Sequence, residues 1–221
     1  MKNVKWIDGE LYEGVEEKAF PSLEKLSVEN LLKLERMLRD EGVEMLPRLS
    51  QLTIYGVFNF KVPHLPCVEE LDARRIVAAT SFIEGVGDNM VCLKTLRFSL
   101  IKGLKVLLDQ LRRLGSLEYL HIGFWYDLEH FPKHVSEGFT SLRSLSISNC
   151  ENLKSLPEGV LHLTCLRCLS ISNCPQLVAL PSNMSKLTSL RTVYIDDCCT
   201  LPFGLQFVPF IARLAGRYDY C

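Results

Sequence analysis

The amino-acid sequence predicts an α/β solenoid, a coil of short units that share one parallel β-sheet and one apolar interior. Three observations predict it: a triplet of apolar residues recurs along most of the chain, its period stays near 24 residues, and apolar and polar residues alternate within it. The clearest examples are Leu142-Leu145-Ile147, Leu166-Leu169-Ile171 and Leu190-Val193-Ile195, each 24 residues beyond the last. Each such unit can bury its apolar face only against its neighbours, so the units are expected to stack.

The same triplet continues towards the N-terminus, at steps of 26, 19, 25, 24, 25, 24 and 24 residues between successive first positions. This Leu-x-x-Leu-x-Leu pattern at a period of roughly 20–29 residues is the signature of a leucine-rich repeat. We therefore expect a leucine-rich-repeat solenoid, or horseshoe, with a concave parallel sheet and convex loops and short helices. The expected single domain, 1–221, holds about eight repeats in 19–202, a partial repeat in 1–18 and a C-terminal cap or tail in 203–221.

Within each unit the triplet predicts a short strand, because side chains of a strand alternate between its two faces. In residues 144–148 the serines point outward and Leu145 and Ile147 inward. The return segments predict short convex helices at 158–163 and 183–187. Apolar residues at helical spacing make 100–114 the expected long helix, whereas 73–92, which contains two glycines, is expected to be less regular.

Composition and charge exclude several classes of partner and location. The formal net charge is −1 and 48% of residues are hydrophobic, so neither nucleic acid nor an anionic membrane is an expected partner. No apolar run approaches the roughly 18 residues of a membrane span. The first residues lack the apolar stretch of a signal peptide, and the nine cysteines lack the spacing of a small disulfide framework. We expect reduced thiols and a cytoplasmic protein.

Three stretches resemble a known family: AFPSLEKL at 19–26, LRSLSISNCENLKSLP at 142–157 and its copy at 166–181. They are similar to the repeats of plant nucleotide-binding leucine-rich-repeat disease-resistance proteins, the coiled-coil branch especially, over about residues 19–202. The resemblance implies an intracellular immune receptor. Its repeats would sense a pathogen effector or a guarded host protein and restrain the nucleotide-binding switch.

The implied partners are therefore proteins: an effector, a host protein, or the nucleotide-binding domain of the same receptor. This chain contains no G-x-x-x-x-G-K-[ST] phosphate-binding loop, so it would supply only the repeat portion. An independent intracellular repeat scaffold, or the substrate-recognition arm of a ubiquitin ligase adaptor, remains the alternative.

No catalytic motif, cofactor site or metal site is expected. The sequence holds no nucleophile elbow and no H-E-x-x-H. His130 and His134 have the spacing of a helical metal pair, but Pro132 lies between them and no third ligand is evident. We expect a binding module rather than an enzyme.

One position after each late strand carries a cysteine: Cys150, Cys174 and Cys198 are 24 residues apart. Stacking would bring them into a line within disulfide reach. The favoured interpretation is structural, with each side chain satisfying a backbone carbonyl as the chain leaves the strand. Trp125 holds the same register and is expected in the core.

The outward positions of the strands predict the surface that contacts a partner. Aromatic and arginine side chains anchor most protein interfaces, and the alternative is a solvated strand face. The expected partner-binding residues are Tyr55, Arg74, Arg97, Tyr119, His121, Phe124, Tyr126, Tyr194 and Asp196.

A second set, Arg143, Arg167 and Arg191, flanks three consecutive strands. Like charges roughly 5 Å apart repel unless something neutralises them. These arginines are a candidate for intramolecular docking of an acidic domain, and the alternative is a solvated edge screened by salt.

Overall fold

The computed structural model describes residue 5 and residues 20–36, 46–105, 109–131 and 138–201. The expected partial repeat at 1–18, except Lys5, and the expected cap at 203–221 lie outside this range. The elements follow the order β1 (Lys25–Glu29), β2 (Gln51–Tyr55), β3 (Glu70–Arg74), α1 (Ala79–Asn89), β4 (Thr95–Ser99), η2 (Asp109–Arg113), β5 (Tyr119–Gly123), β6 (Ser144–Ser148), η4 (Glu158–His162), β7 (Cys168–Ser172), η5 (Met184–Lys186) and β8 (Thr192–Asp196), where η marks a 3₁₀ helix.

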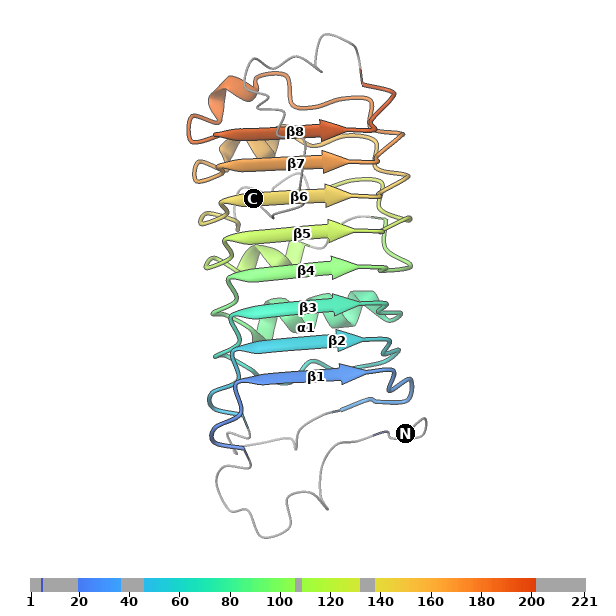
Figure 1. Cartoon of the computed structure of the whole chain (residues 1–221), viewed down its shortest axis with the longest axis vertical. Helices are drawn as coiled ribbons and strands as arrows, with labels where there is room; N and C mark the ends of the chain where they lie inside the picture. The colour runs from blue at the N-terminus through green and yellow to red at the C-terminus, as the bar shows by residue number, and fades with distance from the viewer. Residues whose placement is uncertain (1–4, 6–19, 37–45, 106–108, 132–137, 202–221) are drawn as a thin grey trace.

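The strands form one eight-stranded sheet in chain order, and every neighbouring pair is parallel. Figure 1 shows them side by side along the molecule, with α1 behind the sheet at β3. Leu145 pairs with Leu169, and Leu169 with Val193, so the repeated triplets lie in one row. The α/β leucine-rich-repeat solenoid predicted from the sequence is confirmed.

The core lies between the sheet and the return segments. Inward residues of the strands, such as Leu52, Leu96 and Leu169, are at most 1% exposed. Each fully buried aliphatic side chain stabilises the fold by roughly 1.5–3 kcal/mol. Because each unit's inward residues contact those of the next, this stabilisation depends on stacking rather than on any single unit.

Aromatic side chains fill the core between the middle repeats. The rings of Phe60, Phe82, Phe98 and Trp125 follow one another at centroid distances of 6.3–6.4 Å, and the Phe98–Trp125 pair meets edge to face at 88°. Edge-to-face contact at this distance adds about 0.5–1.5 kcal/mol beyond area burial. Trp125 is fully buried, as its register predicted.

The expectation for the longest helix was wrong. Residues 79–89, not 100–114, form the α-helix of the described chain. Its two glycines allow close packing: a Cβ on Gly85 would lie 2.9 Å from Cβ of Val62, and one on Gly87 only 2.5 Å from the carbonyl oxygen of Gln110. Sequence propensity disfavours glycine in a helix, but here the glycines let α1 lie against both neighbouring return segments.

The segment 100–114 instead begins as a loop and ends in the 3₁₀ helix η2, with residues 106–108 outside the described range. Gly103 has a φ of +80°, a left-handed conformation that interrupts a right-handed helix. The two short convex helices expected at 158–163 and 183–187 are present as the 3₁₀ helices η4 and η5.

A residue in the left-handed conformation follows every strand, with φ between +48° and +67°. After β1 to β7 its backbone N–H donates to the last carbonyl of the next strand, as from Asn149 to Ser172 at 3.0 Å. In five repeats this residue is Asn, Gly or Asp, the types that tolerate positive φ. In three consecutive repeats it is a larger residue. The eight are Asn30, Gly56, Arg75, Leu100, Phe124, Asn149, Asn173 and Asp197.

Candidate functional site

The sheet face turned away from the core, called the open face below, is the predicted concave surface. The middle outward residue of each strand forms a row across it, since the register pairs Asp72 with Arg97, Arg97 with His121, and His121 with Ser146. Neighbouring strands are about 4.8 Å apart. These four side chains, from β3 to β6, are therefore immediate neighbours.

An ion pair fixes one end of this row. The guanidinium of Arg74 donates to both carboxylate oxygens of Asp72, at 2.8 Å from Nε and 2.5 Å from the terminal nitrogen. A bidentate pair of this kind holds both side chains in one orientation. It also neutralises Asp72, so Arg97 dominates the charge in the centre of the row.

His121 is half-buried on β5, and its Nδ1 lies 3.1 Å from Oγ of Ser146. Burial, and then the nearby guanidinium of Arg97, lower the pKa of His121 below its usual value. Its ring lies over Gly123, where an added Cβ would be 2.9 Å from Nε2. The imidazole is therefore neutral at pH 7 and presents a flat ring beside a cation.

The His121–Ser146 contact has the composition of a base and a nucleophile, but not the surroundings of a catalytic pair. The residue flanking His121 on its other side is Arg97, whereas a triad needs an acidic group to orient and stabilise the protonated base. The backbone of β6 is paired with β5 and β7, so its N–H groups are not available to stabilise an oxyanion.

The structure divides the predicted partner-binding residues into two groups. Tyr55 pairs in register with Arg74, and with Arg97, His121 and the 40%-exposed Tyr119 it forms one patch over β2–β5. Tyr194 and Asp196 lie on β8, beyond β6 and β7. There the tyrosine hydroxyl donates to the Asp196 carboxylate at 2.9 Å.

Phe124 and Tyr126 lie beyond the end of β5 rather than on a strand. Phe124 is the left-handed residue of its repeat, with φ of 51°, so the chain turns off the sheet there. Both side chains remain 38–42% exposed. They extend the aromatic patch to the edge formed by the C-terminal ends of the strands.

The three arginines of the candidate docking set are exposed and directly precede β6, β7 and β8. Arg143 forms an ion pair with Glu118 of the previous repeat at 3.3 Å, which relieves part of the expected repulsion. Arg167 and Arg191 have no ion pair within the described residues. This edge, at the N-terminal ends of the strands, is opposite the one that carries Phe124.

The cysteine register has the structural role that its spacing suggested. The thiols of Cys150, Cys174 and Cys198 lie 3.5, 3.4 and 3.3 Å from the carbonyl oxygen two residues earlier. The neighbouring thiol of Cys150, with burial adding to it, raises the pKa of Cys174 to about 11. A thiol with that pKa is protonated and unreactive at pH 7.

Sequence analysis missed two features of this surface: the left-handed residue after each strand, and Gly123 beneath the His121 ring. Asn30, Asn149 and Asn173 in one register were the available signal for the first, because asparagine tolerates positive φ. Nothing in the residue types of Arg75, Leu100 or Phe124 marks them as left-handed.

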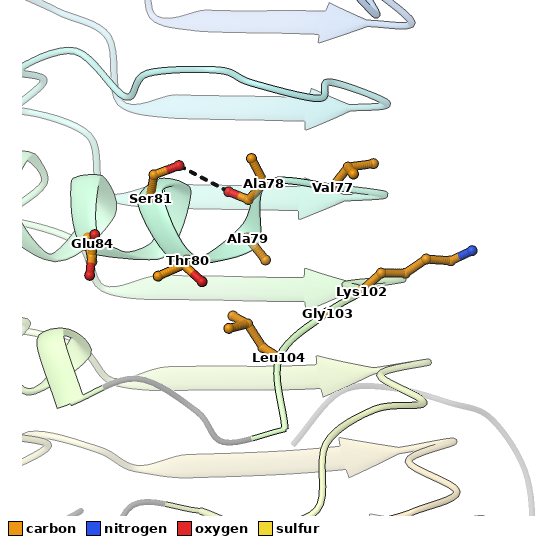
Figure 2. Close-up of a pocket in the computed structure, with 9 residues that line it drawn as sticks. All are labelled: Val77, Ala78, Ala79, Thr80, Ser81, Glu84, Lys102, Gly103 and Leu104. Carbon is orange, nitrogen blue, oxygen red and sulfur yellow. Dashed lines mark hydrogen bonds between the residues drawn. The ribbon is translucent and has the colours of Figure 1, made fainter.

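A hollow of about 270 Å³ opens on the return side, between the start of α1 and the turn after β4 (Figure 2). Val77, Ala79 and Leu104 supply apolar surface, and the side chain of Lys102 extends away from the helix. Within the described ranges, no three His, Cys, Asp or Glu side chains gather as metal ligands, and no helix is long and apolar enough to cross a membrane.

These features define a leucine-rich-repeat solenoid with an aromatic and cationic open face. A family profile described as R13L1/DRL21 LRRs matches residues 101–174. A protein of Solanum bulbocastanum named as disease resistance protein RGA1 is 33% identical over 135 residues, which is 61% of this chain and 13% of that protein. The resemblance to the repeat domains of plant nucleotide-binding disease-resistance proteins is confirmed, and the chain spans about an eighth of the length of this relative.

A solved structure agrees on the fold. The leucine-rich repeat domain of the type III effector XopL aligns with a TM-score of 0.61 at 18% identity, covering 84% of this chain and 73% of that one. A Leptospira interrogans leucine-rich-repeat protein aligns at 0.43 and 17%, covering 89% and 61%. Repeat domains of the matched family are recognition scaffolds rather than catalysts, which supports protein–protein recognition as the role of this chain.

Proposed function

We propose that the chain is the recognition and regulatory repeat domain of an intracellular plant immune receptor, located in the cytoplasm. It binds a pathogen effector or a guarded host protein and holds the receptor's nucleotide-binding domain in check. The resemblance to a disease-resistance protein supports the class. The gathering of Arg97, Tyr119 and His121 on adjacent strands carries the assignment of the binding face.

The way in which the sheet presents these side chains favours binding. Arginine and tyrosine contribute most of the energy in protein interfaces, and here they project from a rigid sheet. Little ordering entropy is lost when they meet a partner. The neighbouring serines of β6 and β7 form a smooth, polar floor beside them, so the patch has a defined border.

The candidate docking set serves the regulatory half of the proposal. Arg143, Arg167 and Arg191 offer three cations in a row at one edge of the sheet, where an acidic surface of the nucleotide-binding domain can dock. Two of the three have no ion pair among the described residues, so their charge is available to such a partner.

The first test is the full-length transcript. A phosphate-binding loop encoded upstream supports the receptor, whereas an F-box upstream contradicts it and favours a ubiquitin ligase adaptor. The second test uses the protein segment that this transcript encodes upstream of the chain. That segment is purified separately, and its binding to this chain is measured. Arg167→Glu with Arg191→Glu should weaken that binding about tenfold or more.

The recognition face is tested with the partner that the receptor responds to. The triple substitution Arg97→Ala, Tyr119→Ala and His121→Ala should weaken binding about tenfold or more, because truncating anchors costs more than truncating their surroundings. The matched control, Ser170→Ala with Ser172→Ala and Thr192→Ala, lies on the same face and should bind as the unmodified chain does. Unchanged affinity of the first triple would remove the face assignment.

A further inference from the structure

The three large left-handed residues lie together. Arg75, Leu100 and Phe124 follow β3, β4 and β5, with φ of 56°, 56° and 51°. A non-glycine residue at positive φ is uncommon, and a bulky one is a true outlier. Strained backbone of this kind gathers at functional sites. The repeats on either side use Gly56 and Asn149 at the same position, so the fold itself does not require a large residue there.

The side chains of Arg75 and Phe124 are exposed and that of Leu100 is half-buried. With their outward neighbours they form one surface, which we call the β3–β5 edge. Two positions past each left-handed residue the side chain again faces solvent, while the residue between them is buried in the core. Val77 and Tyr126 are 49% and 38% exposed. The edge consists of Arg75, Val77, Leu100, Lys102, Phe124 and Tyr126.

Charge is distributed unevenly between the outward residues of β3–β5, with the edge that follows them, and the corresponding residues of β6–β8. The segments 72–77, 97–102 and 121–126 each run from the middle outward residue of a strand to the end of the edge. Together they hold four cations and one anion. The corresponding segments of β6–β8, at 146–151, 170–175 and 194–199, hold three anions and no cation. The single anion of the first group, Asp72, is paired with Arg74. A chain with a net charge of −1 therefore carries a local positive surface here.

We propose that the β3–β5 edge binds an acidic protein segment that carries apolar side chains, and that Arg75, Leu100 and Phe124 are its contact residues. The arginine and lysine attract the acidic groups, and Phe124 and Tyr126 supply aromatic contact. The hollow beside Val77 and Lys102 (Figure 2) has room for one apolar side chain of the segment. This inference rests on the proposed function only in taking the ligand to be protein. Its contact residues lie at the edge that continues the patch of Arg97, Tyr119 and His121, and they are not the residues substituted in the test of that patch.

The probe is a library of random peptides, each about 12 residues long, which is enough to cross three strands in an extended form. It is displayed on phage and selected against the whole chain. Enriched sequences should be rich in Asp and Glu together with Leu, Phe or Trp, and one of them is then measured by fluorescence anisotropy. Enrichment of basic sequences, or of none, would overturn the proposal.

Substitutions separate binding from folding. Arg75→Asn should raise the midpoint temperature of unfolding, because asparagine tolerates the left-handed backbone. The same substitution should weaken binding of the peptide about tenfold. Phe124→Ala and Phe124→Gly should each weaken binding of the peptide about tenfold, although the glycine variant is the more stable. Asn149→Gly, at the same position of a repeat outside the edge, should leave affinity unchanged.

Three outcomes contradict the proposal: peptide affinity unaffected by the Phe124 variants, a lower unfolding temperature for Arg75→Asn with binding intact, or loss of binding in Asn149→Gly. The triple alanine variant of the open face separates this inference from the proposed function. If it retains the peptide while Phe124→Ala loses it, the edge is an independent site. If only the open-face variant loses the peptide, the edge assignment is wrong.

Discussion

Replacing Gly87 by alanine sets two physical effects against each other. Gly87 is inside α1, where alanine is intrinsically favoured by about 0.8–1 kcal/mol. Its added Cβ, however, would lie 2.5 Å from the carbonyl oxygen of Gln110, against about 3.3 Å for a close carbon–oxygen contact. The obstructing atom is backbone, so α1 or η2 must move by roughly 0.8 Å. Overpacking of this kind costs about 1–3 kcal/mol.

The steric cost should prevail, and Gly87→Ala should destabilise the protein by about 1 kcal/mol. For a chain of this size that lowers the unfolding midpoint by about 2–4 °C, measurable by circular dichroism during heating and by urea titration. Two other glycines serve as controls. Gly115→Ala meets nothing within 4 Å and should change stability by less than about 0.5 kcal/mol.

The second control isolates backbone conformation from sterics. Gly103 also has open space around it, but its φ is +80°, so Gly103→Ala should cost about 1–2 kcal/mol through strain alone. If Gly87→Ala proved as stable as Gly115→Ala, the close approach of α1 to η2 would be refuted as the reason for glycine at position 87.

Two further predictions concern the return side and the core. Trp125→Phe should cost about 1–3 kcal/mol in urea denaturation, because the indole N–H donates to the Leu104 carbonyl at 2.9 Å and that acceptor loses its donor in a partly buried place. Glu129 accepts from Lys105 and Lys154, which lower its carboxyl pKa from 4.5 to about 2. The stability it contributes should be complete above about pH 4.5 and disappear as pH falls through about 2. Glu129→Gln should remove that part of the acid dependence without moving the rest of the pH profile.

The strands were predictable because their signal is local and repeated. Period-two alternation around Leu145 and Leu169 specifies which side chains face inward, and the 24-residue step then specifies which strands pair. The same register predicted the burial of Trp125. These predictions follow from the one requirement that every unit must bury an apolar face against the next.

The helix at 79–89 was not predictable in that way. Gly85 and Gly87 lower helix propensity, and the reason for them lies in Val62 and Gln110, residues of other repeats. Tertiary packing overrides propensity here. The His121–Ser146 contact could have been inferred from the shared row, whereas the left-handed backbone of Phe124 could not, since phenylalanine has no preference for it.

The constant strand register has a consequence for how such a molecule can change. Steps between strands range from 19 to 26 residues, yet all eight strands align residue for residue, so length variation is absorbed on the far side of the coil. Duplicating one 24-residue unit, such as 142–165, would insert one extra strand with three outward side chains. Each existing strand would keep its own outward side chains and its register. Duplication or deletion of whole repeats in the gene can therefore widen or narrow the binding surface without changing how the core packs.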